Sequence, residues 1–182
     1  YFDREGELRG RLLTSTNFVP NTRTITLKDY NERGKGSTNI KFDLAQQSMG
    51  AHISEFPVGT YKKGHAHGPG AHVIILTGQG YSIMWPEGEK PQRFDWKPNT
   101  VIVPPDQWFH QHFNAGAAPA RYLAFKHGSQ RNAQGVMMCW ISRRLGGDQL
   151  DYADESSFIR EQFETALARH GLQSRMAPVY AK

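Results

Sequence analysis

Short runs of β-favouring residues, separated by turn-forming residues, recur through the middle of the sequence and constrain its fold more than any other feature. The runs span residues 51–56, 71–77, 81–85, 100–103, 108–113, 121–126 and 136–142. Turn signals rich in glycine, proline and asparagine lie between them at 57–59, 78–80, 86–88, 104–105, 114–116 and 132–135. Many short strands at regular spacing predict an all-β fold, an antiparallel barrel or sandwich.

The first 50 residues differ from this middle part. They are polar and irregular, with a loop-like stretch at 31–39 and strand-like pieces at 22–27 and 40–44. We expect residues 1–50 to form an arm that wraps the domain or a partner subunit. The barrel itself is predicted to span residues 51–145.

The C-terminal part, residues 146–182, is predicted to be a helix and a tail that pack on the barrel. Asp154 or Ser156 can cap the start of a helix within 151–170, and Gly171 ends it. One face of this helix carries an apolar stripe, made of Ile159, Phe163, Ala166 and Leu167.

Composition excludes several classes of protein. The longest apolar run, 136–141, is strand-sized and too short to span a membrane, and no secretory leader is visible, so neither membrane nor export is expected. A single cysteine, Cys139, rules out a disulfide framework within the chain and favours an inert core thiol in the cytoplasm. The net charge of +5 is scattered, so we expect no nucleic-acid partner.

Two clusters of histidine stand in the strand-rich part. His65 and His67 are two residues apart, so on extended chain they share a face, and His72 follows after a glycine-rich turn. In the second cluster, His110 and His112 also share a face. A lone histidine on a strand is more often a hydrogen-bonded core or surface residue than a ligand. This clustering favours a metal site instead, with His65, His67, His72 and His110 as ligands.

Imidazole groups bind Fe(II), Zn(II), Ni(II) and, in mixed sites, Mn(II). Four histidines that converge on one side of such an ion leave positions open for water, substrate or O2, as catalytic sites require. The sequence therefore predicts one divalent transition metal as cofactor, with Fe(II) favoured over Mn(II), Zn(II) and Ni(II).

Both clusters resemble the two motifs of the cupin superfamily, over roughly residues 50–127. Gly59, His65 and His67 fit the first motif, Gly-x5-His-x-His-x(3,4)-Glu-x6-Gly. His72 stands where that motif has glutamate, and Gly78 or Gly80 lies one residue from its last glycine.

The second motif is Gly-x5-Pro-x-Gly-x2-His-x3-Asn. Pro105, His110 and Asn114 match it, while Asn99 and Gln107 replace its two glycines. The resemblance implies a cupin barrel, a double-stranded β-helix or jelly roll with the metal in its mouth, often in a homodimer. An all-histidine ligand set would leave a divalent site at formal charge +2 and attract anionic chelators.

Other side chains are candidates for roles around the metal. His112 shares the face of His110 and is the first choice for a catalytic base or a residue that supports a ligand; its alternative is a core imidazole. A further set could line an apolar substrate pocket, although core packing is the favoured explanation for each: Tyr61, Met84, Trp85, Trp108 and Phe125.

Three functions fit these features. Three- and four-histidine cupins resemble dioxygenases, so the first is an Fe(II) dioxygenase-like oxidoreductase that acts with O2 on a small oxygenated organic substrate. The second is a non-redox lyase, isomerase or decarboxylase that uses Mn(II), Zn(II) or Ni(II) as a Lewis acid. The third is a non-catalytic cupin that binds a metal or ligand.

Overall fold

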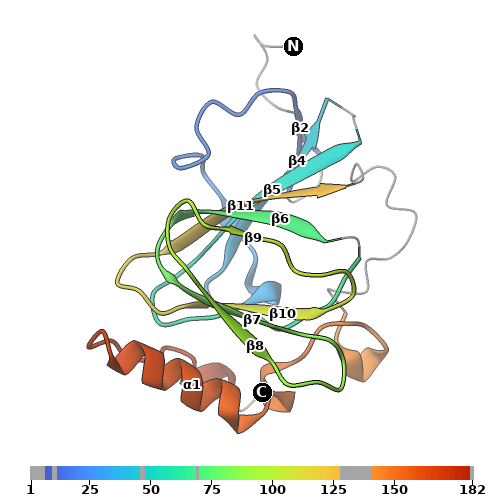
Figure 1. Cartoon of the computed structure of the whole chain (residues 1–182). Helices are drawn as coiled ribbons and strands as arrows, with labels where there is room; N and C mark the ends of the chain where they lie inside the picture. Colours follow the sequence, from blue (N-terminus) through green and yellow to red (C-terminus); the bar gives the residue numbers. More distant parts are fainter. Residues whose placement is uncertain (1–6, 10–11, 46–47, 69, 128–140, 181–182) are drawn as a thin grey trace.

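The computed structural model describes residues 7–9, 12–45, 48–68, 70–127 and 141–180. Two β-sheets face each other, and the single α-helix among these residues, α1 (Ser157–Ala168), lies against the outer side of the smaller sheet (Figure 1). The smaller sheet runs in the order β10 (Phe109–Asn114), β7 (Gly80–Trp85), β8 (Gln92–Trp96). All its pairings are antiparallel.

The larger sheet has the order β1-β2-β4-β5-β11-β6-β9, with β3 paired to β4. Its strands are β1 (Glu7–Arg9), β2 (Leu13–Thr16), β3 (Lys28–Asp29), β4 (Thr38–Leu44), β5 (Met49–Phe56), β6 (Ala71–Thr77), β9 (Val101–Ile102) and β11 (Ala120–His127). Only the β2–β4 pairing is parallel among those described. The chain crosses between the sheets repeatedly, as in a jelly roll, and this confirms the predicted fold class.

The strand predictions from 51 to 126 are confirmed, and the bounds shift by a residue or two. The strand predicted at 22–27 is wrong: residues 22–24 form a turn, and the short strand β3 follows instead. Strand β8 was missed because four of its five residues are exposed, so it lacks the apolar alternation that marks a half-buried strand. The predicted strand at 136–142 and Cys139 lie largely or wholly outside the described residues.

The N-terminal segment extends the larger sheet. Strand β4 pairs with β5 from Thr38–Glu55 to Asp43–Gly50, and β2 adds to the other side of β4. Apolar side chains of the two strands form a core cluster between them, with Phe42 and Ile53 almost fully buried. The predicted arm therefore contributes strands to the fold that carries the site.

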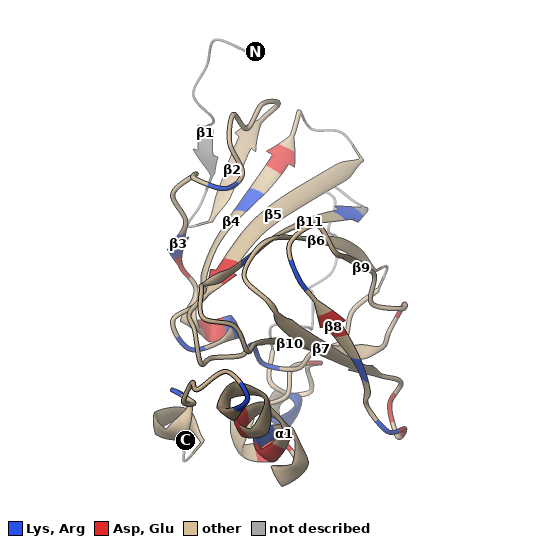
Figure 2. Cartoon of the chain, turned by 60° about the vertical axis from the view of Figure 1, so that its left-hand side comes forward, with Lys and Arg blue, Asp and Glu red and all other residues tan. Residues whose placement is uncertain are grey.

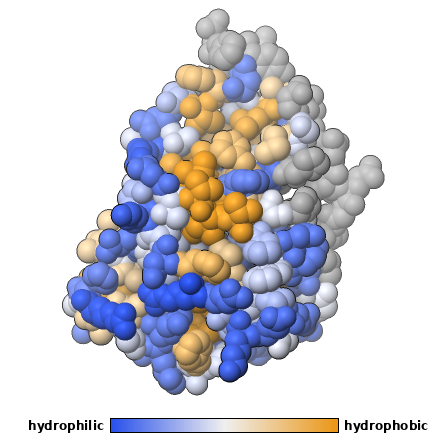
Figure 3. All heavy atoms as spheres, viewed as in Figure 1, coloured by the Kyte–Doolittle hydropathy of each residue, from blue (hydrophilic) through white to orange (hydrophobic). Residues whose placement is uncertain are grey.

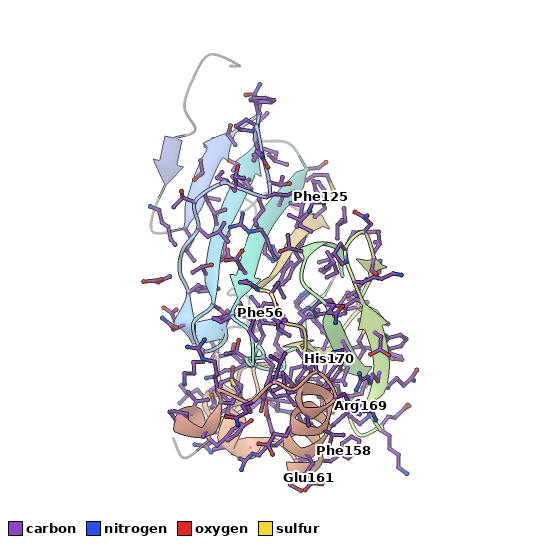
Figure 4. All side chains as sticks on the ribbon, turned by 90° about the vertical axis from the view of Figure 1, so that its left-hand side faces the viewer. Phe56, Phe125, Phe158, Glu161, Arg169 and His170 are labelled. Carbon is purple, nitrogen blue, oxygen red and sulfur yellow. The ribbon has the colours of Figure 1, made fainter. Side chains whose placement is uncertain are left out.

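The predicted stripe of α1 is confirmed, since all four of its residues are buried. Phe163 is 0% exposed and packs with Tyr61 and Phe113, whose ring centroids lie 5.0 and 5.7 Å from its own. Phe158 and Glu161 point away from the sheets (Figure 4). Ser156 occupies the N-cap position without a side-chain hydrogen bond, and Gly171 adopts φ +67° after the helix.

The outer surface mixes charge and apolar area. Basic and acidic residues are interspersed on the strands and on α1 (Figure 2). A group of apolar side chains lies open in the middle of the face shown in Figure 3, over the larger sheet. Within the described residues, no helix has the length and apolar character needed to cross a membrane.

Candidate metal centre

Three imidazoles meet between the two sheets. His65 and His67 lie in the segment before β6, and His110 lies in β10. One ligand nitrogen from each ring lies within 4.8 Å of the other two. Their exposed fractions are only 7%, 8% and 3%. The structure thus brings together three of the four histidines that the sequence predicted as ligands.

Backbone pairing explains this convergence. The N–H of His65 donates to the carbonyl of His110 (3.2 Å), and the N–H of His110 donates back to His65 (2.9 Å). On the other edge of the segment, the N–H of Leu150 donates to the carbonyl of Gly64 (2.8 Å). A segment held between two neighbours in this way is extended, so alternate side chains such as His65 and His67 share a face.

Burial keeps the imidazoles of His65 and His110 neutral. Desolvation lowers the pKa of His110 to about 3, against the opposing effect of its contact with the Trp108 carbonyl. In a neutral ring, Nδ1–H donates to that carbonyl (3.1 Å), which leaves the Nε2 lone pair for a cation. Burial and the nearby Arg33 guanidinium lower the pKa of His65 in the same direction.

The donor set fits a divalent transition metal. Three neutral, buried imidazoles without a carboxylate among them are typical ligands of Fe(II), Ni(II) or Zn(II). Arg33 Nη2 lies 2.5 and 2.6 Å from the two ring nitrogens of His65, and its Nη1 donates to Gln149 Oε1 (2.7 Å). A neutral ring has one lone pair, so metal binding at His65 requires the ion to replace one of these contacts.

The structure does not bring His72, the predicted fourth ligand, to the other three histidines. Its neighbours Ala71 and Val73 are buried and line the histidine pocket, whereas His72 is exposed. Side chains alternate along a strand, so the register that turns Ala71 inward turns His72 outward. Its strand partner is Phe125 on β11.

His112 lies where the sequence predicted, inside the pocket beside the three ligands. It is 4% exposed, and its ring centroid lies 5.7 Å from that of His110. Its Nδ1 is 2.7 Å from the hydroxyl oxygen of Ser82, which also accepts a hydrogen bond from Trp96 Nε1 (3.1 Å). Burial lowers the pKa of His112, so the ring is neutral. Its catalytic role remains a prediction.

The side chains predicted to form an apolar substrate pocket do not lie at the three histidines. None of these five residues lines the cavity at the histidines; all five pack elsewhere, as the core-packing alternative allowed. Tyr61 is 0% exposed behind β10, Met84 and Trp108 pack in the core cluster of Val73 and Trp96, and Trp85 stacks on Phe109. Phe125 packs against the β4–β5 cluster, at the end of the strands far from α1 (Figure 4).

Polar and basic residues line the pocket instead. Most come from β4, β5 and β11 of the larger sheet, opposite the histidines: Arg33, Lys41, His52, Lys62, Tyr122 and Lys126. Among the described residues that line the cavity, none is Asp or Glu. Sequence reasoning missed this set because each residue stands alone in its strand, away from the histidine clusters.

The two residues that replace motif glycines adopt the backbone conformation that glycine favours. Asn99 has φ 72° and Gln107 has φ 60°, both in the left-handed region. The N–H of Gln107 donates to the carbonyl of His67 (3.2 Å), which ties this turn to a candidate ligand. The motif glycine that is present, Gly59, has φ 71° and would place a Cβ 2.5 Å from the carbonyl oxygen of Gln173.

The buried carboxyl of Glu155 contacts β10 on the side away from the histidine pocket. Glu155 accepts hydrogen bonds from Tyr61 Oη (2.7 Å) and Gln111 Nε2 (2.5 Å), and Gln111 lies between His110 and His112. Burial raises the pKa of Glu155 from its ordinary 4.5 to about 7, although these hydrogen bonds oppose the shift.

We expect the free energy of unfolding of Glu155→Gln, relative to that of wild type, to be higher at pH 8 than at pH 5. Between pH 4.5 and about 7, the folded protein keeps a proton on Glu155 that the unfolded chain has lost, so the contribution of this group falls as the pH rises. The effect is up to about 3 kcal/mol. Urea unfolding of both proteins at the two pH values measures it, with the exposed Glu161→Gln as control. An equal difference between variant and wild type at both pH values would contradict this expectation.

Comparisons with known proteins bear on the fold. No protein-family model and no curated protein matches the sequence. An oxalate decarboxylase mutant from Bacillus subtilis is similar with a TM-score of 0.50 and 14% identity, over 53% of this chain and 27% of that chain. Peruvianin-I, described as a cysteine peptidase from Thevetia peruviana latex, is similar with a TM-score of 0.51 and 11% identity, over 62% of this chain and 72% of that chain. A cupin-like protein from Thermotoga maritima has a TM-score of 0.46 and 15% identity, over 62% of this chain and 84% of that chain.

The two facing sheets of this chain agree with its fold likeness to the first two of these structures. The match spans about a quarter of the oxalate decarboxylase chain, so that enzyme's activity does not carry over with the fold. This chain has the cupin fold, with His65, His67 and His110 as its candidate metal ligands.

Proposed function

We propose that this protein is a metal-dependent enzyme that holds one divalent transition-metal ion on His65, His67 and His110. The main support is the convergence of three buried imidazoles, each with a ligand nitrogen within 4.8 Å of the other two. Three protein ligands leave positions on such an ion for an exogenous molecule, which is the mark of a catalytic rather than a structural site.

The reaction we favour is that of an Fe(II) dioxygenase-like oxidoreductase acting on a small oxygenated organic substrate. The motif resemblance to histidine-rich cupins supports this choice. Bound iron would supply Lewis acidity and redox chemistry with O2. The chain would supply a pocket that excludes bulk water and, in His112, a neutral imidazole to accept or return a proton.

A second candidate is a non-redox lyase, isomerase or decarboxylase with Mn(II), Zn(II) or Ni(II). The observation that favours it is the His112–Ser82 pair, at 2.7 Å, next to the ligands. A base held in this way can move a proton without any change in the oxidation state of the metal. In this reaction His112 would be the residue that takes the proton from substrate.

Oxygen uptake separates these candidates. We expect the protein loaded anaerobically with Fe(II) to consume O2 when small oxygenated acids are added, and the Zn(II)-loaded protein to consume none. Conversion of substrate without O2 uptake, with Mn(II), Zn(II) or Ni(II), would replace the first candidate with the second. Stoichiometric metal and tight ligand binding without any turnover would contradict both and indicate a binding protein.

A further inference from the structure

Lys62 is buried in the histidine pocket, where its charge has no acidic partner among the described residues. The residue is 3% exposed. Its ammonium donates to the hydroxyl of Ser54 and lies 5.1 and 5.4 Å from the ring centroids of Tyr122 and Phe56. A hydroxyl and two aromatic faces compensate only part of the cost of burying an ammonium group.

The charges around Lys62 increase that cost. Burial and the Arg33 guanidinium lower the pKa of Lys62. Four basic residues depress the pKa of His52, after burial itself: Lys126, Lys62, Lys41 and Arg33. These four residues therefore all contribute positive potential to the histidine pocket. Asp43, two residues beyond Lys41 on β4, is not among the residues that line it.

The histidine end of the pocket adds to this positive potential when a metal binds. Three neutral imidazoles leave a divalent ion at formal charge +2. The backbone of Lys62 pairs with β10, because its N–H donates to the carbonyl of His112 (3.0 Å), and its side chain reaches across the pocket to Ser54 on β5. The cavity has a volume of about 50 Å³, which admits only a few water-sized groups. A ligand must therefore be compact to reach both the ion and Lys62.

We propose that the pocket binds a compact organic dianion, a short dicarboxylate, with one carboxylate at the histidine-bound metal and the other at the ammonium of Lys62. This proposal rests on the proposed metal site for its first contact, and on Lys62 alone for its second. A carboxylate at Lys62 would accept a charge-assisted hydrogen bond from the buried ammonium. Such bonds are stronger than hydrogen bonds between neutral groups. A bound carboxylate would hold on the Lys62 amine the proton that burial disfavours, and a neutral substrate would not.

Titration calorimetry on the Zn(II)-loaded protein tests the proposal with malonate, acetate and malonamide. We expect malonate to bind at least about tenfold more tightly than acetate and malonamide not to bind. Lys62→Met should weaken malonate binding by about tenfold to a hundredfold while zinc stays stoichiometric. Lys62→Gln is a second variant, in case the first does not fold.

Lys63→Met is the matched control. The ammonium of Lys63 pairs with Asp151 at 2.8 Å, and Lys63 does not line the histidine pocket. Its loss should leave malonate affinity within about twofold. Equal affinity for malonate and acetate, or equal malonate binding by wild type and Lys62→Met, would overturn the dianion proposal. Elemental analysis of the same samples decides the metal proposal separately, since zinc content does not depend on Lys62.

Discussion

Replacing His110 with alanine is expected to abolish stoichiometric binding of a divalent metal, whereas replacing His72 with alanine is expected to leave it unchanged. His110 offers its Nε2 lone pair to the centre of the site because Nδ1–H is held by the Trp108 carbonyl. Loss of one of three ligands should lower metal affinity by more than about a hundredfold, since even partners that only orient a ligand contribute tenfold to a hundredfold.

His72→Ala is a demanding control, because the sequence motif places His72 at a ligand position and the structure places it outside. Its exposed side chain and inward-facing neighbours predict unchanged zinc content and affinity. Elemental analysis after dialysis, followed by competition with a chromophoric chelator, measures both quantities. Stoichiometric zinc in His110→Ala would refute the three-histidine centre, and weaker zinc binding in His72→Ala would restore the fourth ligand.

The sequence predicted the strands and the histidine pairs because both depend on local periodicity. Residues two apart on an extended segment share a face whatever surrounds them, so His65 with His67, and His110 with His112, needed no tertiary information. The apolar stripe of α1 was predictable for the same reason. The left-handed φ of Asn99 and Gln107 was implied only through the motif, because neither residue by itself demands that conformation.

The structure differs from the expectations where side-chain placement depends on strand register or on distant strands. His72 follows the glycine-rich stretch 68–70 of the sequence, and one residue of register decides whether it faces inward. The basic lining of the pocket comes from η1 (Asn31–Arg33), β4, β5 and β11, and only the stacking of two sheets brings Arg33 and Lys126 near the histidines. Aromatic residues close to the motifs, such as Tyr61, were predicted to line a pocket but pack in the core behind it.

Phe163→Ala is expected to destabilise the protein by about 3–5 kcal/mol, a large share of the stability of a typical domain. Phe163 is 0% exposed and contacts both Tyr61 and Phe113, so its removal leaves a cavity between α1 and the smaller sheet. Phe158→Ala, on the same helix but 53% exposed, should change stability by less than about 0.5 kcal/mol. Urea unfolding of the metal-free proteins compares the two variants, and equal losses would contradict this packing.

The same variant tests whether the helix and the metal site belong to one cooperative unit. Phe113 lies on β10, three residues from His110, so the strand that Phe163 supports also carries a ligand. A metal that binds only the folded protein stabilises it by about 2.7 kcal/mol at a free concentration of one hundred times Kd. Zinc should therefore restore much of the stability that Phe163→Ala loses, and should restore none in the double variant Phe163→Ala, His110→Ala. Equal rescue of both proteins would mean that zinc binds elsewhere on the chain.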